Sequence, residues 1–160
     1  MNDSQGPRGL LRLFLRFPIL LFRIELGWLF RDRLVLLTHT GRNSGRPRRV
    51  VVEITRLDRA SRTLYILSGW GEQSNWVRNI QKTPDVLVQV GLREWPATAS
   101  RLDAAQAERE LLDYAARRSQ AFGALAKRYG IGLPPGSAPA AICKDLAAQI
   151  PLFRLSPRTG

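Results

Sequence analysis

The chain is poor in the two residues that most often build metal sites and nucleophilic active sites. Its 160 residues include one cysteine, Cys143, and one histidine, His39. A lone cysteine excludes an internal disulfide and fits a reducing cytoplasm. A lone histidine makes a histidine-based metal cluster or a Ser-His-Asp triad difficult to assemble. Because His39 alternates with threonines at the end of an apolar run, we expect a packed or hydrogen-bonded strand residue rather than a catalytic base.

Acidic residues are also scarce, and this scarcity sets the charge of the molecule. Lysine and arginine together number 25 against 13 aspartates and glutamates, so the net charge is +12. Such an excess implies an anionic partner, which can be a nucleic acid, an acidic membrane face or a multiply charged small molecule. No helix-turn-helix, zinc-finger or RNA-recognition signature accompanies the charge, so we expect no specific nucleic-acid binding.

Residues 10–30 form the most apolar stretch, but arginines interrupt it. Arg16 and Arg23 would each cost about 3 kcal/mol inside a bilayer, which makes a membrane span marginal. No small-residue cleavage site follows, so a secretory signal is not expected. On a helix, Arg12, Arg16 and Arg23 form one basic stripe beside a wide apolar face. This amphipathic helix can lie on anionic lipid or pack over the domain's own core, and the sequence leaves both open.

The remaining chain alternates short apolar runs with short turns. Strands are expected at residues 34–37, 50–54, 63–67, 86–90, 94–102 and 150–155, and helices at 74–82, 103–118, 121–129 and 140–149. Strands joined by such short turns are antiparallel neighbours, and five or six of them indicate a small barrel. Pro96 favours an edge or a bulge for its strand. We therefore expect an α+β fold with a mainly β core, made of an N-terminal segment at 1–33 and one domain at 34–160.

The first predicted turn carries the clearest chemical signal. It combines turn-forming residues with four arginines: Gly41, Asn43, Ser44, Gly45 and Pro47, and Arg42, Arg46, Arg48 and Arg49. Glycines let backbone N–H groups approach a ligand, and guanidinium groups suit phosphate and carboxylate oxygens. Such a loop can cradle an anion, or it can be a solvated hairpin with surface arginines. Further along, the turn Ser68-Gly69-Trp70-Gly71 can line a pocket for a flat ring, and Trp76 and Asn79 share a helical face.

The string Thr38-His39-Thr40-Gly41-Arg42-Asn43-Ser44-Gly45, with Ser68-Gly69 and Trp76…Asn79-Ile80 downstream, resembles the deazaflavin-dependent nitroreductase family. Its best-known members use coenzyme F420 and belong to the split β-barrel flavin-reductase-like superfamily. The resemblance covers residues 34–102 well and the rest loosely. It implies a split antiparallel β-barrel of about six strands flanked by helices, in which a reduced cofactor passes hydride to a quinone-like, nitro or other lipophilic acceptor.

The resemblance also implies a set of site residues. The cofactor's phosphate and acidic tail would be held by Gly41, Arg42, Asn43, Ser44, Gly45 and Arg48, and its ring by Ser68, Gly69, Trp76 and Asn79. Asn43 stands where the family usually has lysine, which removes one cation. The tyrosines of the family's substrate pocket have no clean counterpart, so Tyr114 is only a weak catalytic candidate.

Two further expectations follow from the scaffold. Related split barrels hold FMN or haem, or bind fatty acids without redox chemistry, so a lipid-binding or hydrophobic-ligand-binding protein is the alternative function. Split barrels also form homodimers, although no interface is evident in this sequence. With the basic N-terminal stripe, these points favour a cytoplasmic protein that sits peripherally on the inner face of the plasma membrane.

Overall fold

A closed antiparallel barrel forms the centre of the molecule. The computed structural model describes residues 32–132 and 139–158. Within these ranges the strands are β1 (Leu34–Thr40), β2 (Pro47–Asp58), β3 (Thr63–Leu67), β4 (Asp85–Val90), β5 (Arg93–Arg101) and β6 (Leu152–Pro157). They follow one another around the barrel in the order β1–β2–β3–β6–β5–β4, and β4 closes it by pairing with β1. The expected α+β fold with a barrel of about six strands is confirmed.

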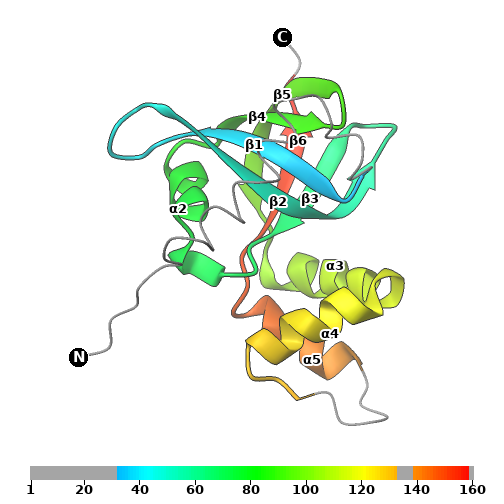
Figure 1. Ribbon diagram of the computed structural model, residues 1–160. Helices are drawn as coiled ribbons and strands as arrows, with labels where there is room; N and C mark the ends of the chain where they lie inside the picture. Colours follow the sequence, from blue (N-terminus) through cyan, green and yellow to red (C-terminus); the bar gives the residue numbers. More distant parts are fainter. Residues whose placement is uncertain (1–31, 133–138, 159–160) are drawn as a thin grey trace, which may run out of the picture.

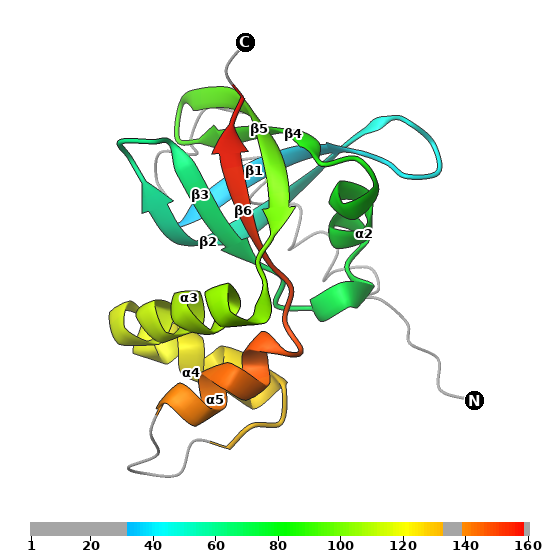
Figure 2. The same cartoon turned by 180° about the vertical axis from the view of Figure 1, so that it is seen from behind.

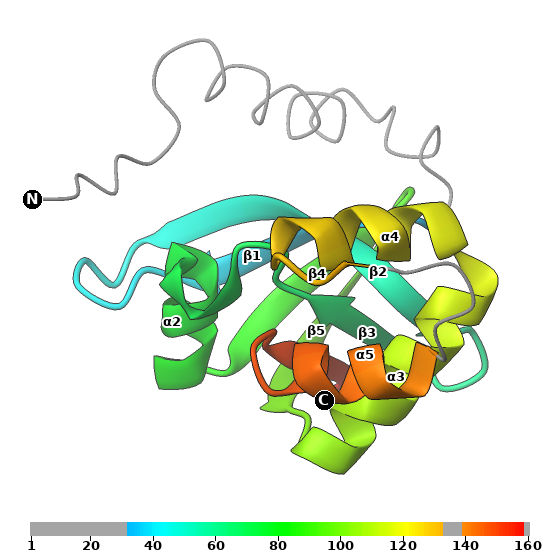
Figure 3. The same ribbon diagram turned by 90° about the horizontal axis from the view of Figure 1, so that it is seen from below.

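The helices fall into two groups around this barrel. Figure 1 shows α3 (Ala104–Arg117), α4 (Ser119–Arg128) and α5 (Pro139–Ala147) gathered below one end of the barrel. In contrast, α2 (Asn75–Lys82) lies apart from them, beside the projecting hairpin of β1 and β2, and follows the 3-10 turn η2 (Gly71–Gln73). Figure 2 shows the same division from behind, and Figure 3 shows the three lower helices from below.

Two hydrophobic cores match this arrangement. The first fills the barrel with inward-facing strand residues such as Val35, Leu37 and Ile66, and α2 covers it with Trp76 and Ile80. The second lies among the lower helices and includes the following buried side chains: Leu111, Tyr114, Phe122, Ile142, Leu146 and Ile150. Because each core spans several elements, the cleft between the barrel and the helices has rigid walls on both sides.

The helix starts follow local sequence signals only in part. Asp103 accepts from the backbone N–H of Gln106 at 2.8 Å while the Gln106 side chain accepts in return, which makes a complete capping box for α3. Ser74 precedes α2 but makes no side-chain cap, because its hydroxyl lies 2.8 Å from that of Ser68. Asp103 therefore caps α3, whereas Ser74 hydrogen-bonds within the preceding turn instead of capping α2.

Two strands differ from the sequence expectation. β2 begins at Pro47 rather than at residue 50, because β1 pairs with it through to Thr40 opposite Pro47. Arg48 and Arg49 therefore lie in a strand and not in a loop. β5 is paired on both sides, so the expected edge strand is wrong for most of its length. Pro96 lies opposite Leu87 of β4, one residue before the pairing with β6 begins, where its missing N–H costs nothing.

One expectation, the amphipathic helix over residues 10–30, lies outside the described residues. Within the described ranges, no helix has the length and apolar character needed to cross a bilayer.

Cys143 is buried in α5, and burial raises the pKa of its thiol to about 11. It therefore stays a neutral thiol at physiological pH.

Candidate active site

A cavity of about 920 Å³ opens between the barrel and the helices. Its walls come from the β1–β2 hairpin, the turn after β3, and helices α2, α3 and α4. It brings together most of the residues singled out in the sequence: Gly41, Arg42, Asn43, Ser44, Arg48, Ser68, Gly69, Trp76, Asn79 and Tyr114. Gly45 is the exception, because it lines a small depression on the other side of the hairpin.

The tip of the hairpin is closed by its own backbone. The N–H of Gly41 donates to the carbonyl oxygen of Arg46 at 2.9 Å, and the N–H of Gly45 donates to that of Gly41 at 2.8 Å. Gly45 has a φ of 64°, which favours glycine. A Cβ on Gly41 would lie 2.8 Å from the Ser44 hydroxyl, so this position has no room for a side chain. These hydrogen bonds and close contacts define a single backbone conformation for the turn.

Arg42 ties this turn to helix α2. Its backbone N–H and its Nη1 both donate to Oδ1 of Asn79 at 3.1 Å, and its guanidinium also donates to Oδ1 of Asn75 at 3.1 Å. The ammonium group of Lys82 donates to the carbonyl oxygen of Arg42 at 2.9 Å. Much of the hydrogen-bonding capacity of Arg42 is therefore used within the protein, and the guanidinium holds the turn against α2.

His39 sits behind this network and is neutral. Its Nδ1 lies 3.1 Å from Nδ2 of Asn79, and its side chain is buried. Burial, with a smaller contribution from the nearby charge of Arg48, lowers the pKa of His39 to about 4. Since the Asn79 amide nitrogen can only donate, Nδ1 accepts and the ring proton is on Nε2. The expectation of a hydrogen-bonded strand histidine is confirmed.

The turn after β3 forms another side of the cavity. Ser68 is buried, and its hydroxyl donates to the carbonyl oxygen of Gly71 at 3.0 Å. Trp70 is 60% exposed, and the guanidinium carbon of Arg128 lies 4.3 Å from the centre of its ring. Arg128 also donates to the carbonyl oxygen of Gly69 at 3.4 Å. The stacked pair of Trp70 and Arg128 therefore presents an aromatic and cationic rim.

Tyr114 belongs to a small polar cluster at the helical side of the cavity. Its hydroxyl donates to Oε1 of Glu53 at 2.8 Å, and Nη1 of Arg118 donates to the same oxygen at 3.1 Å. Burial and the charge of Glu53 raise the pKa of Tyr114 well above its usual value. The phenol therefore keeps its proton under all ordinary conditions, and its O–H is already committed to Glu53.

The cavity combines two kinds of surface. Among residues 32–132 and 139–158, Arg48 and Arg49 of its wall form no ion pair, so their guanidinium groups are available to an anion. Apolar and aromatic side chains line other parts of it: Val50, Val52, Leu67, Trp76 and Leu125. A cavity that combines guanidinium groups with apolar walls suits an amphipathic molecule that has an acidic part and an apolar part.

The wall also contains residues that no sequence motif singled out: Glu53, Asn75 and Arg128. Arg49 of the basic turn and Trp70 of the expected ring-lining turn line the cavity as well. Glu53 and Arg128 lie in an apolar strand and a helix end, and no local pattern marks them. Their place in the site comes only from the packing of α3 and α4 against the barrel.

Fold and cavity together define the class: a barrel protein of the flavin-reductase-like type with a basic hairpin over an apolar cleft. Comparisons with known proteins agree. The family model for F420H(2)-dependent quinone reductase matches residues 23–134. The chain belongs to this family, and it is therefore a deazaflavin-dependent oxidoreductase whose cofactor is coenzyme F420. No curated protein matches the chain.

Solved structures show the same fold at low sequence identity. An F420-H2 dependent reductase, FDR-A, is 19% identical with a TM-score of 0.55, over 79% of this chain and 96% of that one. A protein described as a domain-swapped dimer is also 19% identical with a TM-score of 0.55, over 79% and 81% of the two chains. PhzG from Burkholderia lata 383, in complex with tetrahydrophenazine-1-carboxylic acid, is 15% identical with a TM-score of 0.52, over 96% and 79%. These similarities concern the fold.

Proposed function

We propose that the chain reduces a quinone-like or other electron-poor, lipophilic acceptor with hydride from reduced coenzyme F420. The observation that carries this proposal is the cavity of about 920 Å³, whose lining combines apolar side chains with Arg48 and Arg49, which form no ion pair among the described residues. A cavity of this size accommodates a ring system together with a second small molecule. The family membership supplies the cofactor, and the acceptor is our inference from the apolar and aromatic lining.

The residues present fit the cofactor. Arg48 and Arg49 would hold its phosphate and glutamate groups, whereas the N–H groups of Gly41, Arg42 and Gly45 already donate within the protein. Arg42 would keep that turn in place through Asn75 and Asn79. Trp76 and the apolar strand residues would flank the ring. The bound deazaflavin supplies the hydride, while the protein binds, orients and excludes water.

The protein's own ionisable groups limit where the acceptor's proton comes from. Quinone reduction requires a proton besides the hydride. Neutral His39 uses Nδ1 to accept from Asn79, and the weakly acidic Tyr114 already donates to Glu53. Arginines do not release protons. We infer that Tyr114 positions the Glu53 carboxylate rather than acting as the acid, and that water at the open mouth delivers the proton.

Three finer points are part of the same proposal. Exposed Trp70, stacked on Arg128, suits contact with a flat acceptor ring at the rim. Peripheral membrane contact through residues 10–30 is inferred from the charge pattern of the sequence, and it would bring the chain close to lipophilic acceptors. Cosedimentation of the protein with anionic vesicles tests this membrane contact. A homodimer is supported by the domain-swapped dimer among the similar folds, and sedimentation equilibrium tests it.

The test uses charge reversal in the hairpin. Titrating F420 with protein should quench the cofactor's fluorescence, and the double variant R48E/R49E should weaken binding by about 100-fold because two charge-assisted contacts become repulsive. Arg46→Glu controls for position with one charge reversal instead of two, since Arg46 lies on the same hairpin but does not line the cavity. It should change the affinity less than about threefold.

Turnover is then measured with menadione and reduced F420. Wild type should oxidise the cofactor only when menadione is present, and R48E/R49E should show a raised KM for F420. If micromolar wild-type protein leaves the fluorescence of F420 unchanged at low salt, this result contradicts the proposed cofactor-binding site. Binding without any oxidation by menadione contradicts the quinone-like acceptor.

A further inference from the structure

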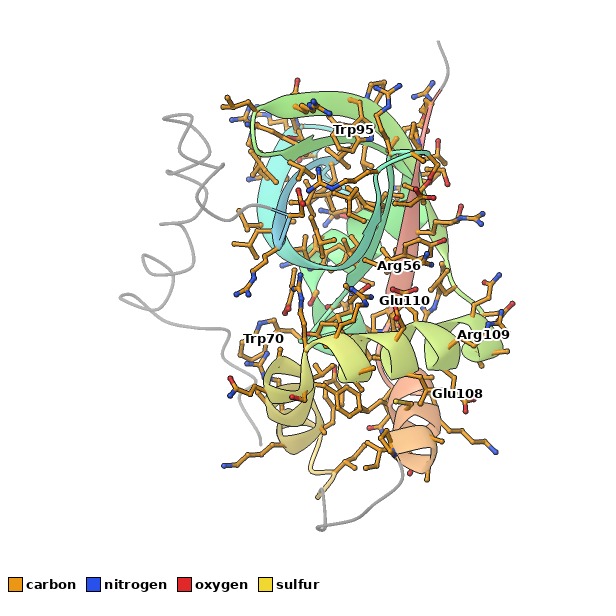
Figure 4. The ribbon with its side chains drawn as sticks, turned by 90° about the vertical axis from the view of Figure 1, so that its right-hand side faces the viewer. Arg56, Trp70, Trp95, Glu108, Arg109 and Glu110 are labelled. Atoms are coloured by element: carbon orange, nitrogen blue, oxygen red, sulfur yellow. The ribbon has the colours of Figure 1, made fainter. Side chains whose placement is uncertain are left out.

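A second cavity, of about 500 Å³, lies between the outer face of the barrel and helix α3. It shares no lining residue with the first cavity. It is lined by Arg56, Tyr65, Leu102, Gln106, Arg109, Glu110, Asp113 and Arg154. Figure 4 shows Arg56 on the barrel side and Glu110 of α3 close together, with Arg109 on the same helix.

The strand register builds one wall of this cavity. Arg56 of β2 lies opposite Tyr65 of β3, and Tyr65 lies opposite Arg154 of β6. The three side chains therefore form one row across the outside of the barrel, opposite in direction to buried Leu64 and Ile66. The guanidinium carbon of Arg56 lies 3.8 Å from the centre of the Tyr65 ring. Arg56 follows a β-bulge in β2, and such irregularities redirect side chains.

Helix α3 supplies the opposite wall. Gln106, Arg109, Glu110 and Asp113 are spaced by three and four residues, which places them on one stripe. Glu110 is only 5% exposed, and Nε of Arg56 donates to its Oε2 at 3.0 Å. A charged group buried this deeply needs such a partner. The pair fixes the helix over the barrel and leaves the other polar groups facing the space between them.

Charge counting shows a surplus of cations in this space. The acid of Glu110 is matched by Arg56, and the acid of Asp113 is matched by Arg117, which donates through Nε at 3.1 Å and lowers the pKa of Asp113. Arg109 and Arg154 have no ion-pair partner in the part of the chain that the structure describes. Two guanidinium groups from different elements thus border one concave space, and neither has an ion-pair partner among the described residues.

We propose that this second cavity binds a small organic anion that carries a phosphate group or two or more carboxylates. Arg109 and Arg154 hold its oxygens, because guanidinium groups pair with such oxygens through two parallel hydrogen bonds. The volume of about 500 Å³ exceeds the need of a bare ion and leaves room for an organic body against Tyr65 and Leu102. The site is separate from the cofactor seat proposed above and does not depend on it.

Isothermal titration calorimetry of the full chain tests this proposal with two probes, glycerol 3-phosphate and citrate, at fixed ionic strength. Wild type should bind at least one probe with a Kd below about 1 mM, which corresponds to a few charge-assisted hydrogen bonds. The double variant R109Q/R154Q should weaken that binding at least about tenfold, since both guanidinium forks are removed. The probe that binds identifies the phosphate or the carboxylate class.

The matched control is the double variant R93Q/K144Q. It removes the same formal charge from exposed positions that line neither large cavity. It should change probe affinity less than about twofold. Equal losses in both double variants would show general charge attraction and would overturn the proposal, as would wild type that binds neither probe. Near-UV circular dichroism confirms that the variants are folded, and F420 titration of R109Q/R154Q should match wild type if the two sites are independent.

Discussion

One carboxamide, that of Asn79, holds three parts of the active site in register. Its Oδ1 accepts from the backbone and side chain of Arg42, and its Nδ2 donates to His39. Asn79 is buried, so replacing it would leave these donors and acceptors without partners. The hairpin turn, strand β1 and helix α2 therefore depend on this residue for their mutual position.

At the same scale, the buried state of His39 predicts an acid-sensitive fold. The pKa of His39 is lowered from 6.5 to about 4, so the unfolded chain binds a proton between these values while the folded chain does not. Stability is then complete above pH 6.5 and falls as the pH drops toward 4. The full shift corresponds to a loss of about 3 kcal/mol in the free energy of unfolding. Urea unfolding at pH 7, 5.5 and 4 measures it.

The variant His39→Gln provides the control, because its side-chain oxygen can still accept from Asn79 but does not titrate. Its stability at pH 7 should fall by about 1 kcal/mol from imperfect packing. Its further loss between pH 7 and pH 4 should be smaller than that of wild type, since only the carboxylates titrate in it. Equal acid losses in both proteins would show that His39 is not the sensitive group.

The sequence indicates the chemical type of the site residues, but it does not show which of them are available to a ligand and which hold the site together. The glycines and arginines of the first turn are compatible both with an anion-binding loop and with a solvated hairpin. Which arginines remain available depends on partners far along the chain: Asn79 is 37 residues from Arg42. Arg48 and Arg49 look the same as Arg42 in sequence, yet they lie in β2 and form no ion pair among the described residues.

Among the elements, the turn from Ser68 to Ser74 most directly shapes the cavity rim. Gly71 has a φ of 67°, and a Cβ there would lie 3.1 Å from the hydroxyl of Tyr129. A Cβ on Gly69 would lie 3.2 Å from Nη1 of Arg128. The turn thus approaches the end of α4 closely, and both glycines let Trp70 stand at the rim.

This contact predicts different costs for two glycine substitutions. Gly91→Ala should lower the free energy of unfolding by about 1 kcal/mol, because Gly91 has a φ of 58° but open space around it. Gly71→Ala should cost about 2 kcal/mol or more, since strain and the Tyr129 contact add. It should also raise the KM for menadione and leave F420 affinity nearly unchanged. Equal effects of the two substitutions on stability and KM would contradict this assignment.

The elements themselves were largely predictable, and the exceptions have a common cause. Short apolar runs between turns marked the strands, and the capping box at Asp103 agrees with the helix expected from residue 103. The strand ends were not predictable, since β2 is extended to Pro47 by pairing with β1. Likewise, no local sequence pattern predicted that Glu53 and Arg128 line the cavity. Each missed feature depends on contact between elements, and no local pattern encodes such contacts.

The whole molecule carries a net charge of +12, which must act on an anionic cofactor before it arrives. Long-range attraction raises the rate of encounter, whereas contacts within the cavity determine how long the ligand stays. Distant surface cations and the arginines of the hairpin should therefore affect different rate constants. This separation distinguishes a specific seat from a generally basic surface.

Stopped-flow fluorescence of F420 binding gives the corresponding prediction. Raising the salt concentration from about 20 to about 300 mM should lower the association rate constant by about tenfold and change the dissociation rate constant less than about twofold. The distant double variant R93E/K144E should likewise lower mainly the association rate. By contrast, R48E/R49E should also raise the dissociation rate by about tenfold or more, because it removes contacts made in the bound state. If all three changes altered only association, the hairpin arginines would act as part of the general field and would not hold the cofactor.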